Sequence, residues 1–213
     1  TKTLPYEGTD TEFLGYIDTY SSSKILAMFK DGNEVNELKV GDEAILILDK
    51  SPFYAESGGQ VGDSGYIKTN RGKFYVQDTI KIKKNIFGHI GVLETGSLKC
   101  NEQVEASIDE HRRDDIKRNH SVTHLLHKAL KIVLGDHVEQ KGSLVDNLKT
   151  RFDFSHTKPI SNDEIHQIES IVNNEILTNK VTTTEMMSID KAKESGALML
   201  FGEKYDSEVR VLN

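Results

Sequence analysis

Two histidines, His120 and His124, stand four residues apart in the run from Arg118 to His127. An α-helix advances about 100° per residue, so the second imidazole lies within about 40° of the first and one turn further along. Both rings could then bind one metal ion. Zinc normally takes four protein ligands, or three plus water. Two histidines on a helix are more often packed than metallated, so the spacing alone favours a packed pair.

The residues inside this pair argue against one familiar metal chemistry. The metalloprotease motif His-Glu-x-x-His places a catalytic glutamate between its histidines, whereas Ser121 and Val122 follow His120 here. The pattern therefore does not indicate a metalloprotease. His127 falls on the same predicted face as the pair, so a three-histidine site with an open water position is geometrically allowed.

Composition limits the partners that this chain can bind. The 213 residues are 36% hydrophobic, carry a net charge of −7 and include one cysteine, Cys100. A single cysteine excludes an internal disulfide framework and fits a reducing cytoplasm. The negative charge argues against nonspecific nucleic-acid binding, and we expect no DNA partner. We also expect no membrane partner, because there is no long apolar run and no signal peptide. The oligomeric state stays open.

Local basic clusters are the sequence's only support for RNA contact. A solvated face, interleaved with acidic residues, is an equally good interpretation of both clusters. The clusters are Lys81, Lys83 and Lys84, and Arg112, Arg113, Lys117 and Arg118.

Up to residue 108 the sequence reads as short β-strands. β-Branched and aromatic stretches alternate with turn residues, and Asp31-Gly32 is a hairpin signal. Several such strands without an amphipathic helix predict a small antiparallel β-barrel, which closes on itself and leaves no edge. The expected strands are 13–20, 24–29, 44–48, 73–76, 79–82 and 104–108. We therefore expect residues 1–108 to form one all-β module.

After residue 108 the pattern becomes helical. Asp109 can cap a helix that runs to about Leu134, where Gly135 suits a left-handed C-terminal residue. Ser161 and Glu164 form a capping box ahead of an apolar stripe at helical spacing. The other expected elements are a short helix between Ser188 and Gly196 and strands at 142–145, 150–154, 181–186 and 208–212. Residues 109–213 therefore predict an α+β domain with helices on a mainly antiparallel sheet.

A glycine-rich segment, Ser51 to Asp63, is the first of three stretches with groups suited to binding. It lacks the Gly-Lys-Ser/Thr ending of a P-loop, so it does not indicate nucleotide triphosphate binding. A turn between strands is the simpler interpretation of Gly58, Gly59 and Gln60. The alternative is a loop whose backbone amides approach a phosphate or another ligand.

The other two stretches contain Gln140 and Arg151. A glutamine amide can both donate and accept hydrogen bonds, which suits recognition of a substrate hydroxyl, although a strand-edge glutamine exposed to water is commoner. Arg151 and Asp153 share one face of a predicted strand, and a simple salt bridge is the favoured interpretation of that pair. Ser57, Ser121 and Thr123 have no recognisable histidine-carboxylate partners, so no covalent nucleophile is proposed.

Six stretches together resemble the editing region of alanyl-tRNA synthetase. Each stretch alone is a weak signal, but all six occur in that family's order across nearly the whole chain. They are Thr11 to Tyr16, Ser51 to Gln60, Asn119 to His127, Gln140 to Val145, Arg151 to His156 and Leu200 to Tyr205.

The resemblance implies a hydrolytic module within a ligase. That family joins alanine to tRNA(Ala) in an amino-terminal domain that uses ATP and Mg²⁺, and its editing region hydrolyses tRNA(Ala) mischarged with serine or glycine. A second site is needed because an alanine pocket cannot sterically exclude glycine and discriminates weakly against one extra hydroxyl. The implied partner is the acceptor 3′ end of tRNA(Ala), and the implied location is the cytoplasm.

The resemblance also assigns roles to particular residues. His127 belongs to the same motif as the histidine pair but is not one of the family's recognised ligands, which weakens the three-histidine idea. The implied site residues are His120 and His124 as two zinc ligands, Gln140 for substrate discrimination, and Gly58, Gly59, Gln60 and Arg151 for RNA or substrate binding.

One departure from the family pattern concerns the zinc site. The family supplies its remaining ligands in Cys-Gly-Gly-Thr-His after a segment like 209–212, whereas this chain ends at Asn213, and Cys100 does not match that motif. We expect a synthetase fragment without the aminoacylation domain and with half of the zinc site, which would bind zinc weakly or not at all. The alternatives are a freestanding trans-editing deacylase, which should carry its own Cys-x-x-x-His, and a noncatalytic RNA-binding module.

Overall fold

The computed structural model describes residues 4–181, 183–195 and 207–212. The chain divides into two compact units, residues 1–117 with 146–148 and residues 118–145 with 149–213. The division falls inside a continuous helix, α1 (Glu110–Leu134), which begins in the first unit and continues into the second. The order of elements changes from strands to helices after residue 108, as expected. The domain boundary between residues 108 and 109 stays a prediction.

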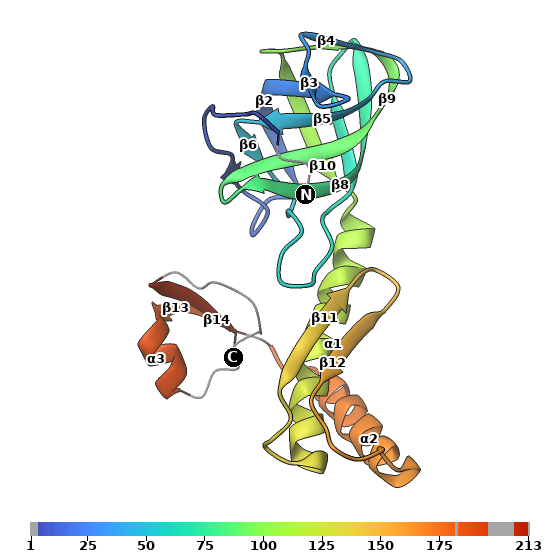
Figure 1. Cartoon of the computed structure of the whole chain (residues 1–213), viewed down its shortest axis with the longest axis vertical. Helices are drawn as coiled ribbons and strands as arrows, with labels where there is room; N and C mark the ends of the chain where they lie inside the picture. The colour runs from blue at the N-terminus through green and yellow to red at the C-terminus, as the bar shows by residue number, and fades with distance from the viewer. Residues whose placement is uncertain (1–3, 182, 196–206, 213) are drawn as a thin grey trace. The chain divides into compact units, whose positions relative to one another are not determined.

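The first unit is a closed antiparallel barrel of six strands in the order β10-β7-β8-β9-β5-β2 (Figure 1). The barrel closes because β10 pairs with both β7 and β2. Its strands are β2 (Tyr20–Lys30), β5 (Glu43–Leu48), β7 (Gly65–Lys68), β8 (Gly72–Lys83), β9 (Ile86–Lys99) and β10 (Gln103–Ile108). Four short strands accompany them: β1 (Glu12–Phe13), β3 (Asn33–Glu34), β4 (Glu37–Lys39) and β6 (Lys50–Ser51). The predicted small barrel is confirmed.

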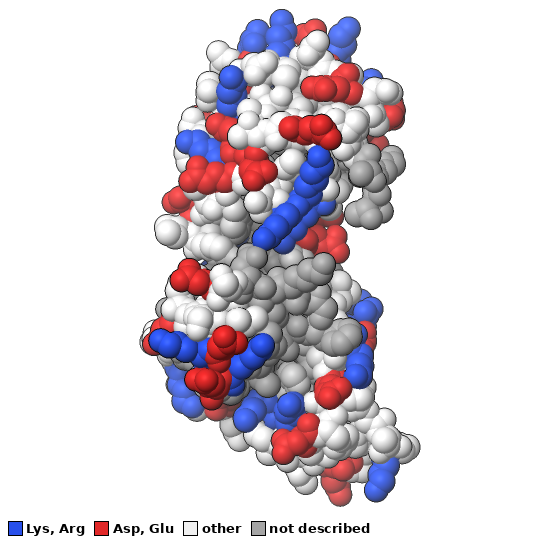
Figure 2. Space-filling view, turned by 60° about the vertical axis from the view of Figure 1, so that its left-hand side comes forward, with Lys and Arg blue, Asp and Glu red and all other residues white. Residues whose placement is uncertain are grey.

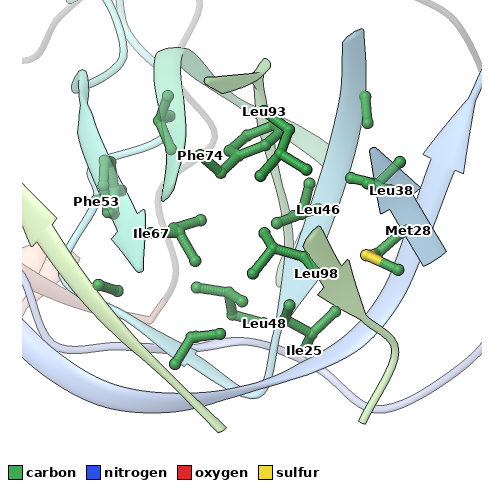
Figure 3. Packing of buried hydrophobic residues seen from close by; sticks show 14 of the residues in the cluster. Ile25, Met28, Leu38, Leu46, Leu48, Phe53, Ile67, Phe74, Leu93 and Leu98 are labelled. Carbon is green, nitrogen blue, oxygen red and sulfur yellow. The ribbon is translucent and has the colours of Figure 1, made fainter. Parts of the chain in front are cut away.

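Alternate residues of the strands fill the barrel, as Figure 3 shows. On β8, Phe74 and Val76 are fully buried while Tyr75 between them is only half-buried. This alternation is the expected result of side chains that point to opposite faces of a strand. The largest fully buried members of this core are Ile25, Met28, Leu38, Leu46, Leu48, Phe53, Ile67, Phe74, Leu93 and Leu98.

In the barrel half one expected strand was wrong in detail and one long strand was not expected. The expected strand 13–20 is a strand only at its two ends, Phe13 in β1 and Tyr20 in β2. Between them the amides of Ile17 and Asp18 both donate to the Leu14 carbonyl in a tight turn. The long strand β9 was not predicted, because its glycines interrupt the alternating pattern. At Gly91 a side-chain carbon would overlap the Tyr75 carbonyl, so close approach of β8 and β9 requires glycine there.

The second unit packs two helices against a β-hairpin. The hairpin is β11 (Gln140–Val145) with β12 (Thr150–Phe154), and α2 (Asn162–Thr178) follows it. Their shared core contains Ala129 and Leu130 of α1, Val138, Phe152 and Phe154 of the hairpin region, and Ile168, Ile171 and Val172 of α2. The predicted α+β class is therefore confirmed.

The predicted helix signals are found at the helix ends. Asp109 accepts a hydrogen bond from the Arg112 amide at 3.0 Å, and Gly135 has φ +114° just after α1. Ser161 and Glu164 exchange both hydrogen bonds of a capping box at the start of α2. Each of these features depends on a few neighbouring residues, which is why the sequence could predict them.

The last described elements form a small group of their own. Strands β13 (Thr184–Ser188) and β14 (Glu208–Leu212) pair in antiparallel fashion, and α3 (Ile189–Glu194) follows β13. The Ser188 hydroxyl accepts from the Lys191 amide and caps α3, as expected, whereas Gly196 lies outside the described residues. In the described parts of the chain no helix is both long and apolar enough to cross a membrane.

Candidate metal and substrate site

His120 and His124 lie on one face of α1, as their spacing predicts. Their rings are stacked, with centroids 5.1 Å apart and planes inclined by 17°. Burial, and then the charge of His124, lower the pKa of His120 from 6.5 to about 4. The His120 imidazole is therefore neutral at pH 7, which is the form that can bind a metal ion.

Two imidazoles one helical turn apart on one face fit half of a tetrahedral zinc site. Across residues 4–181, 183–195 and 207–212, no third histidine, cysteine or carboxylate joins His120 and His124 to form a group that could hold a metal ion. The three-histidine site is therefore not formed in this structure. The assignment of both residues as zinc ligands stays a prediction.

His127 is instead directed into the packing layer between α1 and the hairpin. The residue is 5% exposed, and its ring packs against Phe152 with centroids 5.0 Å apart. Burial, and then the charge of Lys131, lower the pKa of His127, while a hydrogen bond to the Val138 backbone opposes them. The ring therefore donates one N–H to the Val138 carbonyl, and its other nitrogen, Nε2, is buried without a partner.

Gln140 lies in the same layer as His127. The commoner case of an exposed strand-edge glutamine was wrong, because Gln140 is 6% exposed at the start of β11. It stands directly opposite Phe154, so both side chains are on one face of the hairpin. Its Oε1 atom is buried and has no hydrogen-bond partner. A buried neutral amide is compatible with the role in substrate discrimination that was predicted for Gln140. That role stays a prediction.

Thr123 connects the histidine helix to the hairpin, a role that the sequence did not indicate. Its hydroxyl lies 2.6 Å from the Thr150 hydroxyl and also donates to the Asn119 carbonyl at 2.9 Å. Residues 27 positions apart are thereby joined across the layer. Because one partner is a helical threonine and the other begins a strand, only the tertiary structure reveals the pair.

The glycine-rich segment is a tight, internally bonded turn in the first unit. The amides of Ser57 and Gln60 each donate to the other's carbonyl, at 3.2 and 3.0 Å. Gly58 and Gly59 between them have φ +59° and +84°, a conformation that only glycine adopts readily. The simpler interpretation of the segment as a turn between strands is therefore correct. The proposed ligand contacts of Gly58, Gly59 and Gln60 stay predictions.

The end of this glycine-rich segment is anchored by a buried ion pair that the sequence did not predict. Arg113 Nε donates to both carboxylate oxygens of Asp63 at 2.9 Å, and the Asp63 side chain is 2% exposed. Arg113 also donates to the carbonyls of Gly15 and Pro52, at 2.8 and 3.0 Å. On the other side, the Tyr54 amide donates to Asp63 at 2.7 Å. One guanidinium thus holds three segments of the first unit together.

The start of the segment is anchored by a buried serine–histidine pair. Ser51 Oγ lies 2.7 Å from His89 Nε2, and His89 Nδ1 donates to the Leu46 carbonyl at 2.9 Å. Burial lowers the pKa of His89 from 6.5 to about 4, so the ring is neutral and its Nε2 accepts from the serine hydroxyl. Both residues are fully buried, which makes this pair an internal support and not a nucleophile with access to substrate.

Arg151 forms the predicted salt bridge with Asp153, at 3.1 Å and in an exposed position on β12. Figure 2 shows blue and red residues interspersed over the coloured part of the visible face, without a broad patch of one sign. Nucleic-acid contact by this face would therefore depend on individual cations. The predicted contact of Arg151 with RNA or substrate stays a prediction, because the ion pair with Asp153 is compatible with either role.

Comparison with known proteins identifies a family model and several relatives that match this chain. A model of the family "tRNA synthetases class II (A)" matches residues 2–112. The alanine–tRNA ligase of Nitrosospira multiformis is 53% identical over 210 residues, which are 99% of this chain and 24% of the relative. That of Delftia acidovorans is 52% identical over 212 residues, 100% of this chain and 24% of the relative.

A third relative, the alanine–tRNA ligase of Methylobacillus flagellatus, is 54% identical over 210 residues, 99% of this chain and 24% of the relative. The chain thus spans about a quarter of the length of the curated relatives it matches. These matches extend over both units, so they cover the barrel and the helix–hairpin layer alike. The chain therefore belongs to the class II (A) tRNA synthetases and, within that family, is similar throughout to part of the alanine–tRNA ligases.

Proposed function

We propose that this chain is the editing region of an alanine–tRNA ligase and that it hydrolyses tRNA(Ala) mischarged with serine or glycine. The whole ligase would attach alanine to tRNA(Ala) with ATP and Mg²⁺ in a domain outside this chain, in the cytoplasm. Editing would consume one water molecule, break the ester bond to the 3′ end and release the free amino acid and tRNA. The partner of this region would be the acceptor 3′ end.

The observation that supports this function best is the stacked pair of His120 and His124. Both rings share one face of α1, and His120 is neutral at pH 7 because its pKa is about 4. Neutral imidazoles are suited to zinc, and two further ligands would complete a tetrahedral site. Zinc bound there would position the aminoacyl ester or polarise the attacking water. The packed-histidine alternative explains the stacking and the low pKa of His120 equally well, because burial is the main cause of that low pKa.

The test is deacylation of Ser-tRNA(Ala) by the full-length protein that contains this chain. His120→Ala should remove one of the two ligands on α1, so we expect loss of both Ser-tRNA(Ala) and Gly-tRNA(Ala) hydrolysis and a lower zinc content. Elemental analysis measures the zinc. The matched control is His111→Ala, because His111 is on the same helix but exposed. The control should retain both activities.

The outcomes separate the rival functions. A full-length protein without deacylase activity would favour a noncatalytic RNA-binding module with packed histidines. An active protein in which His120→Ala has no effect would exclude the zinc pair while leaving hydrolysis intact. Deacylation by this region in the absence of any ligase domain would favour a freestanding trans-editing enzyme.

A further inference from the structure

The outer wall of the barrel carries a row of tyrosines that the proposed function does not use. Strands β2, β10, β7 and β8 are consecutive neighbours in this wall (Figure 1). Ser107 of β10 stands opposite Tyr20 on one side and Tyr66 on the other. Tyr75 of β8 continues the row opposite Tyr66. Neighbouring strands are about 4.8 Å apart, so the row spans about 14 Å.

The tyrosines of this row point away from the barrel core. Ile67 and Phe74, which alternate with the tyrosines of β7 and β8, are fully buried in the core. Tyr20 is 50% exposed, and Tyr66 and Tyr75 are half-buried. The rings of Tyr66 and Tyr75 lie with centroids 5.3 Å apart. Aromatic rings gathered on one face indicate a binding surface more strongly than rings scattered singly.

Two lysines are gathered on the central ring of this row. Lys68 and Lys73 stand directly opposite each other on β7 and β8. Their ammonium groups lie 5.0 and 4.0 Å from the centroid of the Tyr66 ring. Like charges directly opposite in a sheet destabilise it, whereas an aromatic face attracts cations. The Tyr66 ring therefore holds together two cations that repel each other.

The neighbouring carboxylates neutralise only part of this charge. Glu94 of β9 forms an ion pair with Lys73 at 3.2 Å, and its hydrogen bond raises the pKa of Lys73. Glu105 stands opposite Lys68 on β10, but these two side chains do not form an ion pair. Both lysines are thus charged at pH 7, and a bound anion would relieve their repulsion.

Aromatic rings beside paired cations fit single-stranded nucleic acid. Bases of any sequence stack on aromatic side chains, and cationic groups bind the phosphates between them. A duplex keeps its bases within the helical stack, so the rings require an unpaired strand. The chain belongs to a tRNA synthetase family, which makes RNA the expected nucleic acid.

We propose that the outer wall formed by β2, β10, β7 and β8 binds an unpaired segment of RNA. Lys68 and Lys73 bind one phosphate between them, and Tyr20 and Tyr75 stack on bases to either side. Because stacking and charge provide the affinity, strands of different sequence bind similarly. The surface contains none of the predicted zinc or editing residues. It extends the proposed function to RNA recognition and does not depend on hydrolysis.

The first test measures binding of a fluorescent oligouridylate of about eight nucleotides to the full-length protein. Lys68→Gln/Lys73→Gln should weaken binding about tenfold. The slope of log K against log salt should become about 0.7 shallower, the contribution of one phosphate on a single strand. The matched control is Lys39→Gln/Lys99→Gln, which makes the same change in net charge on exposed residues of β4 and β9. The control should bind as the parent protein does.

The second test addresses stacking and the location of the probe. Tyr20 is exposed at the first residue of β2, so its replacement leaves the barrel core intact. Tyr20→Ala should weaken binding about 5–100-fold, whereas Tyr20→Phe keeps the ring and should match the parent protein. A probe that contains 4-thiouridine should crosslink under ultraviolet light to peptides that contain Tyr20, Tyr66 or Tyr75.

The opposite outcomes would overturn the surface. Crosslinks confined to other peptides, absence of probe binding, or equal losses in the two double-lysine variants would leave the wall as a solvated face. Equal affinities of Tyr20→Ala and Tyr20→Phe would exclude stacking. Deacylation of Ser-tRNA(Ala) is a separate measurement. A protein that binds the probe on this wall but hydrolyses no mischarged tRNA would overturn the proposed function and retain the RNA surface.

Discussion

The glycine-rich segment of the barrel and the helix–hairpin layer treat buried polar groups in opposite ways. In the barrel segment, Asp63 is bound by Arg113 and by the Tyr54 amide, and Ser51 is paired with His89. In the helix–hairpin layer, two buried acceptors have no donor within the described residues. Both regions carry motifs of the same family resemblance. Within the described part of the chain, only the second region has buried side-chain polar atoms without a hydrogen-bond partner.

This difference indicates a division between support and recognition. Fully paired buried groups fix one backbone conformation, because any other leaves a charge or donor unpaired. The barrel segment is therefore preorganised by the chain itself. Buried acceptors without a partner in the protein are rare in native proteins and usually bind an ordered water or a ligand. The comparison predicts large stability effects in the barrel and small ones, with functional consequences, in the other unit.

The largest effect is expected from Arg113→Met. This change leaves the Asp63 carboxylate buried, at 2% side-chain exposure, without its cation, and frees the Gly15 and Pro52 carbonyls. Breaking a buried pair in this way destabilises proteins by about 3–5 kcal/mol. Urea unfolding of the parent protein and the variant measures this loss as a difference in the free energy of unfolding. As a control, Lys117→Met removes an exposed contact of 4.0 Å to Asp114 and should change stability by less than about 0.5 kcal/mol. Similar losses in both variants would refute the anchoring role.

The second effect is a loss of stability at acidic pH that depends on His89. Burial lowers the folded pKa of His89 to about 4, below the value of 6.5 expected when unfolded. The stabilisation is complete above pH 6.5 and is lost as pH falls toward 4, because only the unfolded chain binds the proton in that range. At pH 4.5 the loss should be about 2–3 kcal/mol relative to pH 7.5. A His89→Gln variant has no group at this position that titrates between pH 4 and 6.5. Its free energy of unfolding should therefore lose about 2–3 kcal/mol less than that of the parent protein between pH 7.5 and 4.5. An equal loss in both proteins would exclude His89 as the cause.

Local rules explain most of what the sequence could predict. The Asp31-Gly32 hairpin, the Asp109 cap and the Ser161–Glu164 box each depend on residues within four positions of one another. Alternating apolar residues in β2, β5 and β8 likewise reveal the barrel. The shared face of His120 and His124 follows from helical geometry alone.

Features that depend on distant residues could not be predicted. Arg113 and Asp63 are 50 residues apart, and the basic cluster around Arg113 read equally well as a solvated face. Gln140 is buried at the start of β11, opposite Phe154 of the second unit's core, and no period along β11 reveals this burial. Strand β9 was not predicted because its glycines break the alternating pattern. Those glycines are needed because the β8 backbone approaches β9 too closely for a side chain, as at Gly91.

A smaller effect is expected where α1 meets the hairpin. Thr123→Val keeps the shape of the side chain but removes its hydrogen bond to Thr150. Thr150 retains a contact to the Leu144 carbonyl, at 3.3 Å, so the loss should be about 1 kcal/mol. Urea unfolding of this variant and of the exposed Ser121→Ala, which should stay within about 0.5 kcal/mol, provides the comparison. A loss as large as that of Arg113→Met would show that the second unit also depends on polar anchors.

The smallest stability effect is expected from Arg151→Gln, which removes an exposed ion pair with Asp153. Exposed pairs contribute little, so the free energy of unfolding should change by less than about 0.5 kcal/mol. If Arg151 also contacts a tRNA phosphate, the variant of the full-length protein should bind tRNA(Ala) more weakly, and the slope of log K against log salt should fall by about 1. Asp153→Asn breaks the same ion pair but keeps the cation, so it should not reduce that slope. Equal slopes in both variants and the parent protein would leave Arg151 as a surface salt bridge without a part in recognition.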